Sequence, residues 1–142
     1  MEGTKEKDIW RKMLGRNGED IACLMLQERG FRILDRNFRY GRQEIDIVCL
    51  DGTALRFVEV KTRREPVEGE AWEAVTPAKM RNIGRAAQRY LDSFRSRRSG
   101  RTGPRIPDIE EIFFDIVTVV WDEDMVNYSL EYIQDAFRLL YV

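Results

Sequence analysis

Two short runs of sequence decide the fold: Glu44-Ile45-Asp46-Ile47-Val48 and Phe57-Val58-Glu59-Val60-Lys61. Both alternate apolar and charged residues with the period of a β-strand. The segment between them contains Asp51-Gly52, a pair typical of tight turns. We therefore expect the two runs to form an antiparallel hairpin.

The register of this hairpin decides which charges meet. A two-residue loop, Asp51-Gly52, would place Asp46 diagonal to Glu59, and a four-residue loop from Asp51 to Ala54 would place it directly opposite Glu59. Lys61 shares the face of Glu59, so either register brings two carboxylates and an ammonium group together. A slip by one residue would move Asp46 to the other face.

Two carboxylates that face each other on a sheet repel, and a divalent cation with oxygen ligands removes that repulsion. The pattern therefore indicates a metal site, in which Lys61 could hold a water or stabilise the extra negative charge of a phosphate under attack. The competing interpretation is a solvated salt-bridge ladder on an exposed sheet face. A Glu-x-Lys triplet alone is common by chance, so the metal interpretation depends on Asp46 sharing the face.

Composition limits the chemistry of such a site. The 142 residues, 43% of them apolar, suffice for one domain with a substantial core. The chain contains no histidine, which excludes Ser-His-Asp and Cys-His hydrolases and histidine-ligated zinc sites. A general base must then be a carboxylate, a lysine or a water activated by a metal.

Cysteine usage and hydropathy bear on the compartment. Cys23 and Cys49 each lie in an apolar run, and we expect both to be small core residues in a reducing environment. No secretory segment and no apolar stretch of membrane length is present. We therefore expect a cytoplasmic protein that does not act at a membrane.

Charge is unevenly distributed along a chain whose net charge is −1. Residues 79–105 carry nine basic side chains and one acidic side chain, whereas residues 107–142 carry nine acidic and one basic. A basic segment on a nearly neutral protein is a candidate surface for anion binding.

A first helix is expected to begin near Gly18, with Asn17 as its cap, and to end at Gly30. Glu19 falls at the edge of its apolar stripe, where a purely structural helix would rather place a neutral residue. It could serve a site as a third carboxylate, or it could simply be an acid favoured by the helix dipole.

A second helix is expected to open at Thr76-Pro77, a capping threonine followed by proline at the first helical position. Its apolar stripe predicts the buried face. Its outer row consists of Arg81, Arg85 and Arg89, which either contact phosphates or form a solvated face.

The remaining segments complete an α/β fold with a mixed sheet flanked by helices. We expect strands over 31–40, 109–121 and 126–133, and a short closing helix through Ala136, Phe137 and Leu140. Asp115 lies inside the strand over 109–121, and as a buried acid it needs a partner, for which we expect an arginine. Residues 1–13 are expected to form a loose arm and 14–142 a single domain, with a mobile basic loop at 95–107.

Several segments together resemble the YraN-like family of uncharacterised bacterial proteins: Gly15-Arg16-Asn17-Gly18-Glu19, the two strand runs quoted above with Thr62-Arg63, Glu73-Ala74-Val75-Thr76-Pro77-Ala78-Lys79, Phe114-Asp115-Ile116-Val117 and Asp135-Ala136-Phe137. That family is similar in turn to the Holliday junction resolvases and to the wider PD-(D/E)XK nuclease superfamily. The resemblance implies a restriction-endonuclease-like core with the order αβββαβ.

The resemblance also implies roles. Asp46 and Glu59 would be metal ligands, Lys61 the catalytic lysine and Glu19 the helix carboxylate that completes the site, with Mg²⁺ or Mn²⁺ as the cofactor. Two departures stand out: Ile45 replaces the proline that often precedes the aspartate, and the second helix lacks the early glutamine of several nuclease branches, with Lys79 as the nearest polar candidate.

The function expected from these features is a Mg²⁺-dependent endonuclease that acts on DNA, including structured or branched DNA. Lys79, Arg81, Arg85 and Arg89 would contact the nucleic acid, which could also be RNA. One alternative is a module that binds nucleic acid without cutting it, and another is a protein-interaction domain whose acidic tail recruits a basic partner. Resolvase-like relatives suggest a homodimer.

Overall fold

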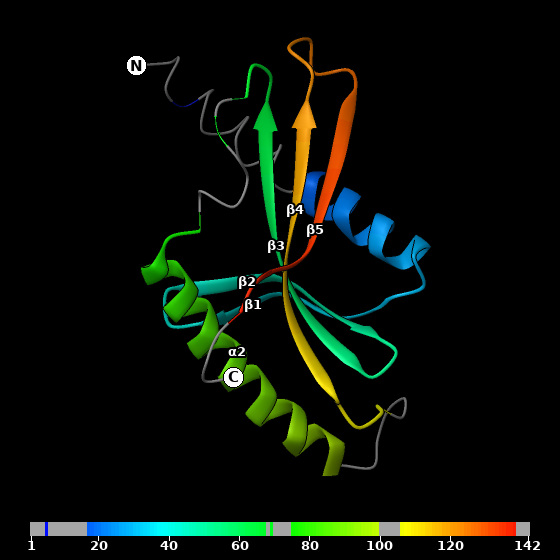
Figure 1. Cartoon of the computed structure of the whole chain (residues 1–142), viewed down its shortest axis with the longest axis vertical. Coiled ribbons are helices and arrows are strands. Elements are labelled where there is room, and N and C mark those ends of the chain that lie inside the picture. Colours follow the sequence, from blue (N-terminus) through cyan, green and yellow to red (C-terminus); the bar gives the residue numbers. More distant parts are fainter. Residues whose placement is uncertain (1–4, 6–16, 68, 70–74, 100–105, 139–142) are drawn as a thin grey trace.

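The chain folds around one twisted sheet, shown in Figure 1 as a computed structural model whose described part comprises residues 5, 17–67, 69, 75–99 and 106–138. Helix α1, described over residues 17–28, precedes the first three strands, and helix α2 separates these from the last two. The elements are β1 (Arg32–Tyr40), β2 (Gln43–Asp51), β3 (Ala54–Arg64), α2 (Pro77–Ser99), β4 (Glu111–Trp121) and β5 (Tyr128–Phe137). The expected α/β order is confirmed, and the strand expected over 126–133 is β5.

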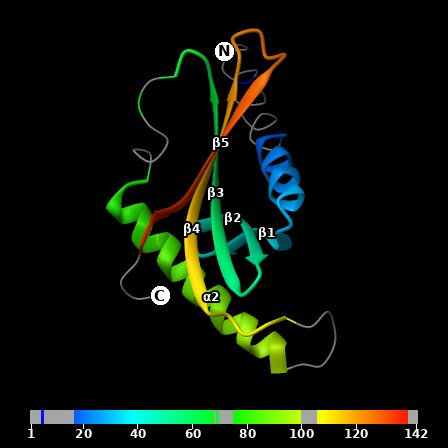
Figure 2. The same cartoon turned by 45° about the vertical axis from the view of Figure 1, so that its right-hand side comes forward.

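The five strands lie in the sheet in their sequence order, from β1 to β5. Strands β3 and β4 are parallel and the other neighbours are antiparallel. Parallel neighbours need a long crossover, and α2 lies within it. The two helices cover opposite faces of the sheet (Figures 1 and 2). This arrangement is consistent with a restriction-endonuclease-like core.

Each helix packs its apolar stripe into a core of its own. The stripe of α2, including Ile83, Tyr90 and Phe94, packs on Phe57 and on neighbouring strand residues. The ring of Tyr90 meets that of Phe57 edge-on, with centroids 5.8 Å apart. On the other face, α1 contributes a cluster of its own to β2, β3 and β4. Periodicity of 3.6 in the helices and of 2 in the strands accounts for both cores.

The hairpin between β2 and β3 has the register in which Asp46 faces Glu59. Asp51 pairs with Ala54, so the loop consists of Gly52 and Thr53 alone. Gly52 has a φ of 59°, a left-handed conformation that glycine adopts without strain. Of the two registers that the sequence left open, the structure therefore has the one in which Asp46 lies opposite Glu59.

The end of the chain differs from expectation. Ala136 and Phe137 belong to β5 and not to a short closing helix, while Leu140 lies outside the described residues. The reason is packing, because Phe137 is the register partner of Phe114 and stacks on it with ring centroids 5.2 Å apart. Helix α2 continues through Ser99, into the segment 95–107 that was expected to be a loop.

Two further expectations concern the ends and the membrane. Apart from Lys5, the N-terminal segment 1–13 lies outside the described residues. Among the helices of the described part, none combines the length and apolarity that crossing a bilayer requires.

Candidate active site

The site lies where β2 and β3 separate. Their ladder ends at the pair Ile47 and Val58, and beyond it β2 turns away while β3 continues along β4 (Figure 1). The next positions along the two strands are Asp46 and Glu59. The backbone N–H of Val60 donates to Asp46 Oδ2 at 2.7 Å. The Asp46 side chain thus takes the place of a ladder partner and is held between the strands.

Close packing of α1 against β3 brings Glu19 to the same place. Gly18 is buried, and a Cβ at this position would overlap the hydroxyl oxygen of Thr62 on β3. Only glycine lets the helix backbone approach the strand this closely. Glu19 is the next residue, and its side chain, 20% exposed, lies next to Asp46.

A further carboxylate joins these two. Ligand oxygens of Glu19, Glu44 and Asp46 all lie within 4.8 Å of one another. Asn37, whose backbone is left-handed at φ 53°, is placed between two of them. With its amide nitrogen turned toward the acids, it donates to Glu44 Oε1 at 2.6 Å and to Glu19 Oε2 at 3.0 Å. The sequence reasoning gave no role to Glu44 and missed Asn37.

The carboxylates raise one another's pKa. Burial, followed by the charge of Glu59, raises the pKa of Asp46 to about 8, in spite of the hydrogen bond from the Val60 N–H. Burial and the charge of Glu44 also raise the pKa of Glu19. Glu44 pairs with Arg39 at 2.8 Å and Glu19 lies 3.8 Å from Arg36, whereas Asp46 makes no salt bridge within the described residues.

Glu59 has a different environment. Its side chain is 12% exposed, and its Oε1 accepts a hydrogen bond from Lys79 Nζ at 2.7 Å, while Lys61 Nζ lies 3.8 Å away. Lys61 comes from β3 and Lys79 from the first turn of α2. Two ammonium groups from different elements thus converge on one carboxylate.

The two lysines differ in their proton affinity. Burial and the neighbouring ammonium of Lys79 lower the pKa of Lys61. Burial acts to lower the pKa of Lys79, but the hydrogen bonds with Glu59 and Lys61 and the charges of Glu59 and Asp46 together raise it. Lys79 is therefore the firm ion-pair partner of Glu59, and Lys61 is the more readily deprotonated amine.

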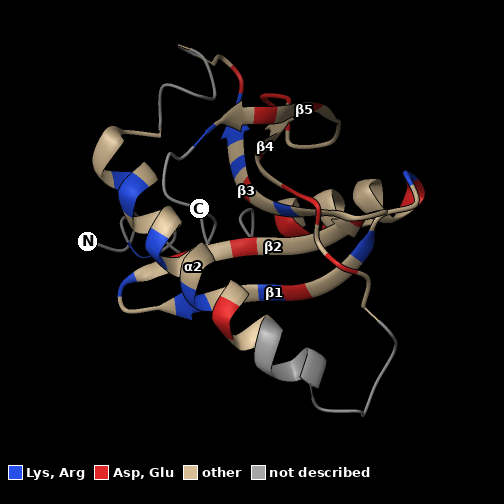
Figure 3. Ribbon diagram, turned by 60° about the horizontal axis from the view of Figure 1, so that its bottom comes forward, with Lys and Arg blue, Asp and Glu red and all other residues tan. Residues whose placement is uncertain are grey.

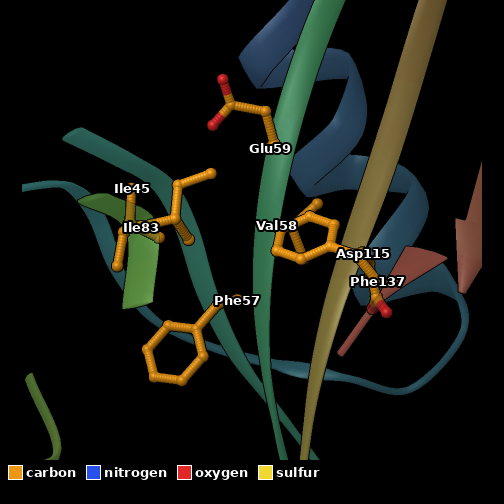
Figure 4. Close-up of a pocket in the computed structure, with 7 residues that line it drawn as sticks. All are labelled: Ile45, Phe57, Val58, Glu59, Ile83, Asp115 and Phe137. Carbon is orange, nitrogen blue, oxygen red and sulfur yellow. The ribbon is translucent and has the colours of Figure 1, made fainter. Parts of the chain in front are cut away.

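An apolar floor lies under this group. Ile45, Phe57 and Ile83 line a small pocket together with Glu59, and Figure 4 shows the Glu59 side chain leaving β3 on the side of Ile45 and Ile83. Apolar surroundings exclude water and strengthen charge interactions. A solvated ladder on an exposed sheet face, the competing interpretation, does not describe this arrangement.

The donor set fits a hard divalent cation. The described side chains at the convergence of Glu19, Glu44 and Asp46 offer carboxylate oxygens, the ligands of Mg²⁺ and Mn²⁺, and the raised pKa values show what a cation there would relieve. Glu59 borders this group, since its charge acts on Asp46, but Lys79 holds one of its oxygens.

The basic residues of α2 divide into two groups. Basic residues, coloured blue, recur along the ribbon of α2 in Figure 3. Arg81, Arg85 and Arg89 are exposed, and within the described part of the chain none of them has a carboxylate partner. Lys79, which the sequence analysis grouped with these arginines, lies instead in the carboxylate site.

Asp115 proves to be structural, as expected. Both of its oxygens accept hydrogen bonds from Arg56 Nη1 at 3.1 Å. The Tyr132 hydroxyl donates to Oδ2 at 2.5 Å and the backbone N–H of Asp135 donates to Oδ1 at 2.8 Å. Cys23 and Cys49 are free and buried, which confirms them as core residues.

Comparison with known sequences shows which family the chain belongs to. The sequence profile of the Uncharacterised protein family UPF0102 matches residues 18–119. The chain belongs to the UPF0102 family. It is 43% identical over 129 residues to the UPF0102 protein Cphamn1_0017 of Chlorobium phaeobacteroides (strain BS1), covering 87% of this chain and 93% of that protein. It is 40% identical over 130 residues to the UPF0102 protein GSU0650 of Geobacter sulfurreducens, covering 92% of each.

The part of the chain that matches the UPF0102 profile contains the whole carboxylate and lysine group. Residues 18–119 begin at the glycine that packs on β3 and run through α2 into β4. The expected membership in an uncharacterised bacterial family is thereby confirmed. UPF0102 is defined by sequence without an assigned activity, so the activity must be argued from the site.

Proposed function

We propose that this UPF0102 protein is a Mg²⁺- or Mn²⁺-dependent endonuclease of the PD-(D/E)XK type that acts on DNA, with structured or branched DNA as its substrate class. The observation that carries the proposal is the convergence of Asp46, Glu19 and the Glu59–Lys61 pair where β2 and β3 separate. A structural network of acids would be matched by cations throughout, whereas burial and the charge of Glu59 disfavour the ionised form of Asp46, which a divalent cation would favour.

Each residue of the site has its own role in this proposal. Asp46, Glu59 and Glu19 would hold the divalent cation, which supplies Lewis-acid stabilisation and an activated water for phosphodiester hydrolysis. The Val60 N–H fixes the orientation of Asp46. Lys61 places an ammonium group beside the scissile phosphate, where it stabilises the charge that develops in the transition state. Ile45, Phe57 and Ile83 supply an apolar lining beside Glu59.

Incubation with a DNA panel tests the activity. Purified protein is mixed with linear, nicked, flapped and four-way DNA in the presence of Mg²⁺, Mn²⁺ or EDTA. We expect cleavage with either metal and none with EDTA, and no cleavage by D46N or E59Q. Intact DNA throughout, at protein concentrations that bind it, would reject the nuclease.

Lys61→Ala separates chemistry from binding. One lysine is a small part of the phosphate-binding surface, so DNA affinity should remain within about twofold to threefold of the parent, while cleavage should fall by about 10²-fold or more. Arg81→Ala is the matched control, since it removes an exposed cation of α2. Cleavage by K61A at the parental rate would show that the ammonium group has no catalytic part.

A second candidate function is a module that binds nucleic acid without cutting it. The observation that favours it is the exposed row Arg81, Arg85 and Arg89 together with a Glu59 that Lys79 already neutralises. In that case the DNA panel would show binding that does not depend on the metal and that D46N leaves unchanged.

A further inference from the structure

Lys79 occupies a position where a lysine is intrinsically unfavourable. It lies in the first turn of α2, where its backbone N–H donates to the capping hydroxyl of Thr76 at 3.2 Å, and this turn contains no acid. The helix dipole gives that end a partial positive charge, which favours acids and disfavours cations. The side chain is 27% exposed, so it also gives up hydration. A specific partner must offset both costs, and Glu59 is that partner.

Two ammonium groups lie close to the Glu59 carboxylate. Lys79 Nζ lies 2.7 Å and Lys61 Nζ 3.8 Å from the same Oε1 atom. One ammonium group suffices to pair with Glu59, and two ammonium groups held together repel, although Asp46 also favours the charged form of both. A structural ion pair has no need of the second lysine, whereas a site that must hold a phosphate does.

We propose that Lys79 is a second lysine of the active site, a positioning residue that holds Glu59 and releases it when a divalent cation binds, after which its ammonium group binds the substrate phosphate beside Lys61. The inference rests on the proposed function, because it takes Glu59 to be a metal ligand. Lys79 keeps one oxygen of Glu59 occupied. In this proposal Glu59 joins Asp46 and Glu19 through the oxygen that Lys79 holds, so the ion pair breaks when the metal binds.

Metal affinity measures this competition directly. Mn²⁺ binding is followed by calorimetry for the parent and for K79M, K79R, K61M and R81Q. K79M should bind Mn²⁺ about tenfold more tightly, because no charge-assisted hydrogen bond has to be broken. K61M removes the same charge from a group that is 3.8 Å from Glu59, and should tighten binding by less than about threefold. K79R and R81Q should match the parent.

A second readout follows the released ammonium group. With Ca²⁺ in place of Mg²⁺ to prevent cleavage, K79M should bind a short DNA duplex more weakly than R81Q does, even though it binds metal more tightly. Opposite changes in the two affinities would not follow from a merely structural role. If K79M does not fold, K79Q serves in its place.

The outcomes distinguish the two proposals. If the parent binds Mn²⁺ and K79M binds it no more tightly, the exchange at Glu59 is overturned and the nuclease proposal stands. If K79M and K61M tighten binding equally, net charge alone acts and the specific role of Lys79 is overturned. If neither the parent nor K79M binds Mn²⁺, the metal site itself is misassigned and both proposals fall.

Discussion

Asp46 and Asp115 are aspartates within strands of the same sheet, yet their surroundings are opposite. The carboxylate of Asp115 is hydrogen-bonded to Arg56, to the Tyr132 hydroxyl and to a backbone N–H. That of Asp46 has the Val60 N–H as its hydrogen-bond donor and faces further carboxylates, with Glu59 the strongest. Arg56 neutralises Asp115, whereas burial and neighbouring carboxylates disfavour the ionised form of Asp46.

The partner of Asp115 is itself held from several sides. Arg56 is 6% exposed, and its guanidinium group lies 4.4 Å from the ring centroid of Phe113 and 3.1 Å from Asp51 Oδ2. A buried ion pair with all its hydrogen bonds made contributes to a unique packing and leaves no charge for chemistry. The hydrogen-bond and ion-pair partners of a carboxylate, and not its burial, therefore distinguish a structural acid from a candidate catalytic one.

The largest expected effect is on stability, and it concerns Asp115. D115N leaves Arg56 buried with an incomplete set of partners, and should lower the free energy of unfolding by about 3–5 kcal/mol. D46N removes a carboxylate whose ionised form its neighbours already disfavour, and should not lower the free energy of unfolding at pH 7. Urea unfolding followed by circular dichroism measures both. Equal losses would mean that Asp46 is a structural acid too.

A smaller loss is expected when α1 is pushed away from β3. In G18A the new methyl group overlaps the Thr62 hydroxyl, so either the side chain or the helix must shift, at a cost of about 1–3 kcal/mol. With T62A present, the nearest remaining atoms to the new methyl are at ordinary van der Waals distances, for instance 3.8 Å to Val119. The cost of G18A should therefore shrink in the T62A background.

G18A and T62A also test whether the position of Glu19 matters for metal binding. If α1 shifts in G18A, Glu19 shifts with it, so Mn²⁺ binding should weaken while the Asp115 network stays unaffected. A double-mutant cycle by urea unfolding gives the coupling. Additive losses would show that Gly18 is not required for the close approach of α1.

The next expected effect is a dependence of the free energy of unfolding on pH. The pKa of Asp46 rises from its ordinary value of 3.8 to about 8 in the folded protein, so between these values the folded state holds one proton more than the unfolded state. The free energy of unfolding therefore decreases as pH rises through this window, by at most about 1.4 kcal/mol per pH unit for this group. D46N lacks the titrating group.

The quantity to measure is the stability of D46N minus that of the parent, by urea unfolding from pH 4 to pH 9. It should increase with pH, because the parent alone loses stability on ionising Asp46. A difference that stays constant over the whole range would mean that the carboxylate ionises normally in the folded protein.

Local pattern predicted much of the fold, and it failed where the chain departs from regular geometry. Strict alternation would put Ile45 and Ile47 on one face, but Ile45 packs in the core under α2 and Ile47 in the core under α1. Asn37 on the neighbouring strand is left-handed at this point. The sequence singled out Asp46, but the grouping with Glu44 depends on this break in the strand, which no periodicity reveals.

The pairing of Lys79 with Glu59 could not be predicted from the sequence for a similar reason. The two residues are on different elements, and their contact depends on how α2 crosses the sheet. Asp135 likewise has a φ of 53°, and its N–H reaches Asp115, so the end of β5 did not show a regular strand pattern. Residues that hold sites together occupy such irregular positions, where tertiary contacts override local preference.

The cations of α2 differ in the same way as the two aspartates. The smallest expected effect on stability concerns its exposed arginines. Lys79 is tied to Glu59, whereas Arg81, Arg85 and Arg89 are exposed, so replacing all three by glutamine should change the free energy of unfolding by less than about 0.5 kcal/mol. If these three arginines contact DNA phosphates, each lost contact should lower the slope of log affinity against log salt by about 0.9. Duplex binding measured at several salt concentrations gives that slope. K79M is the matched variant, and its effect on DNA affinity should instead depend on the metal. Equal slopes for the parent and the triple variant would move the DNA-binding surface away from α2.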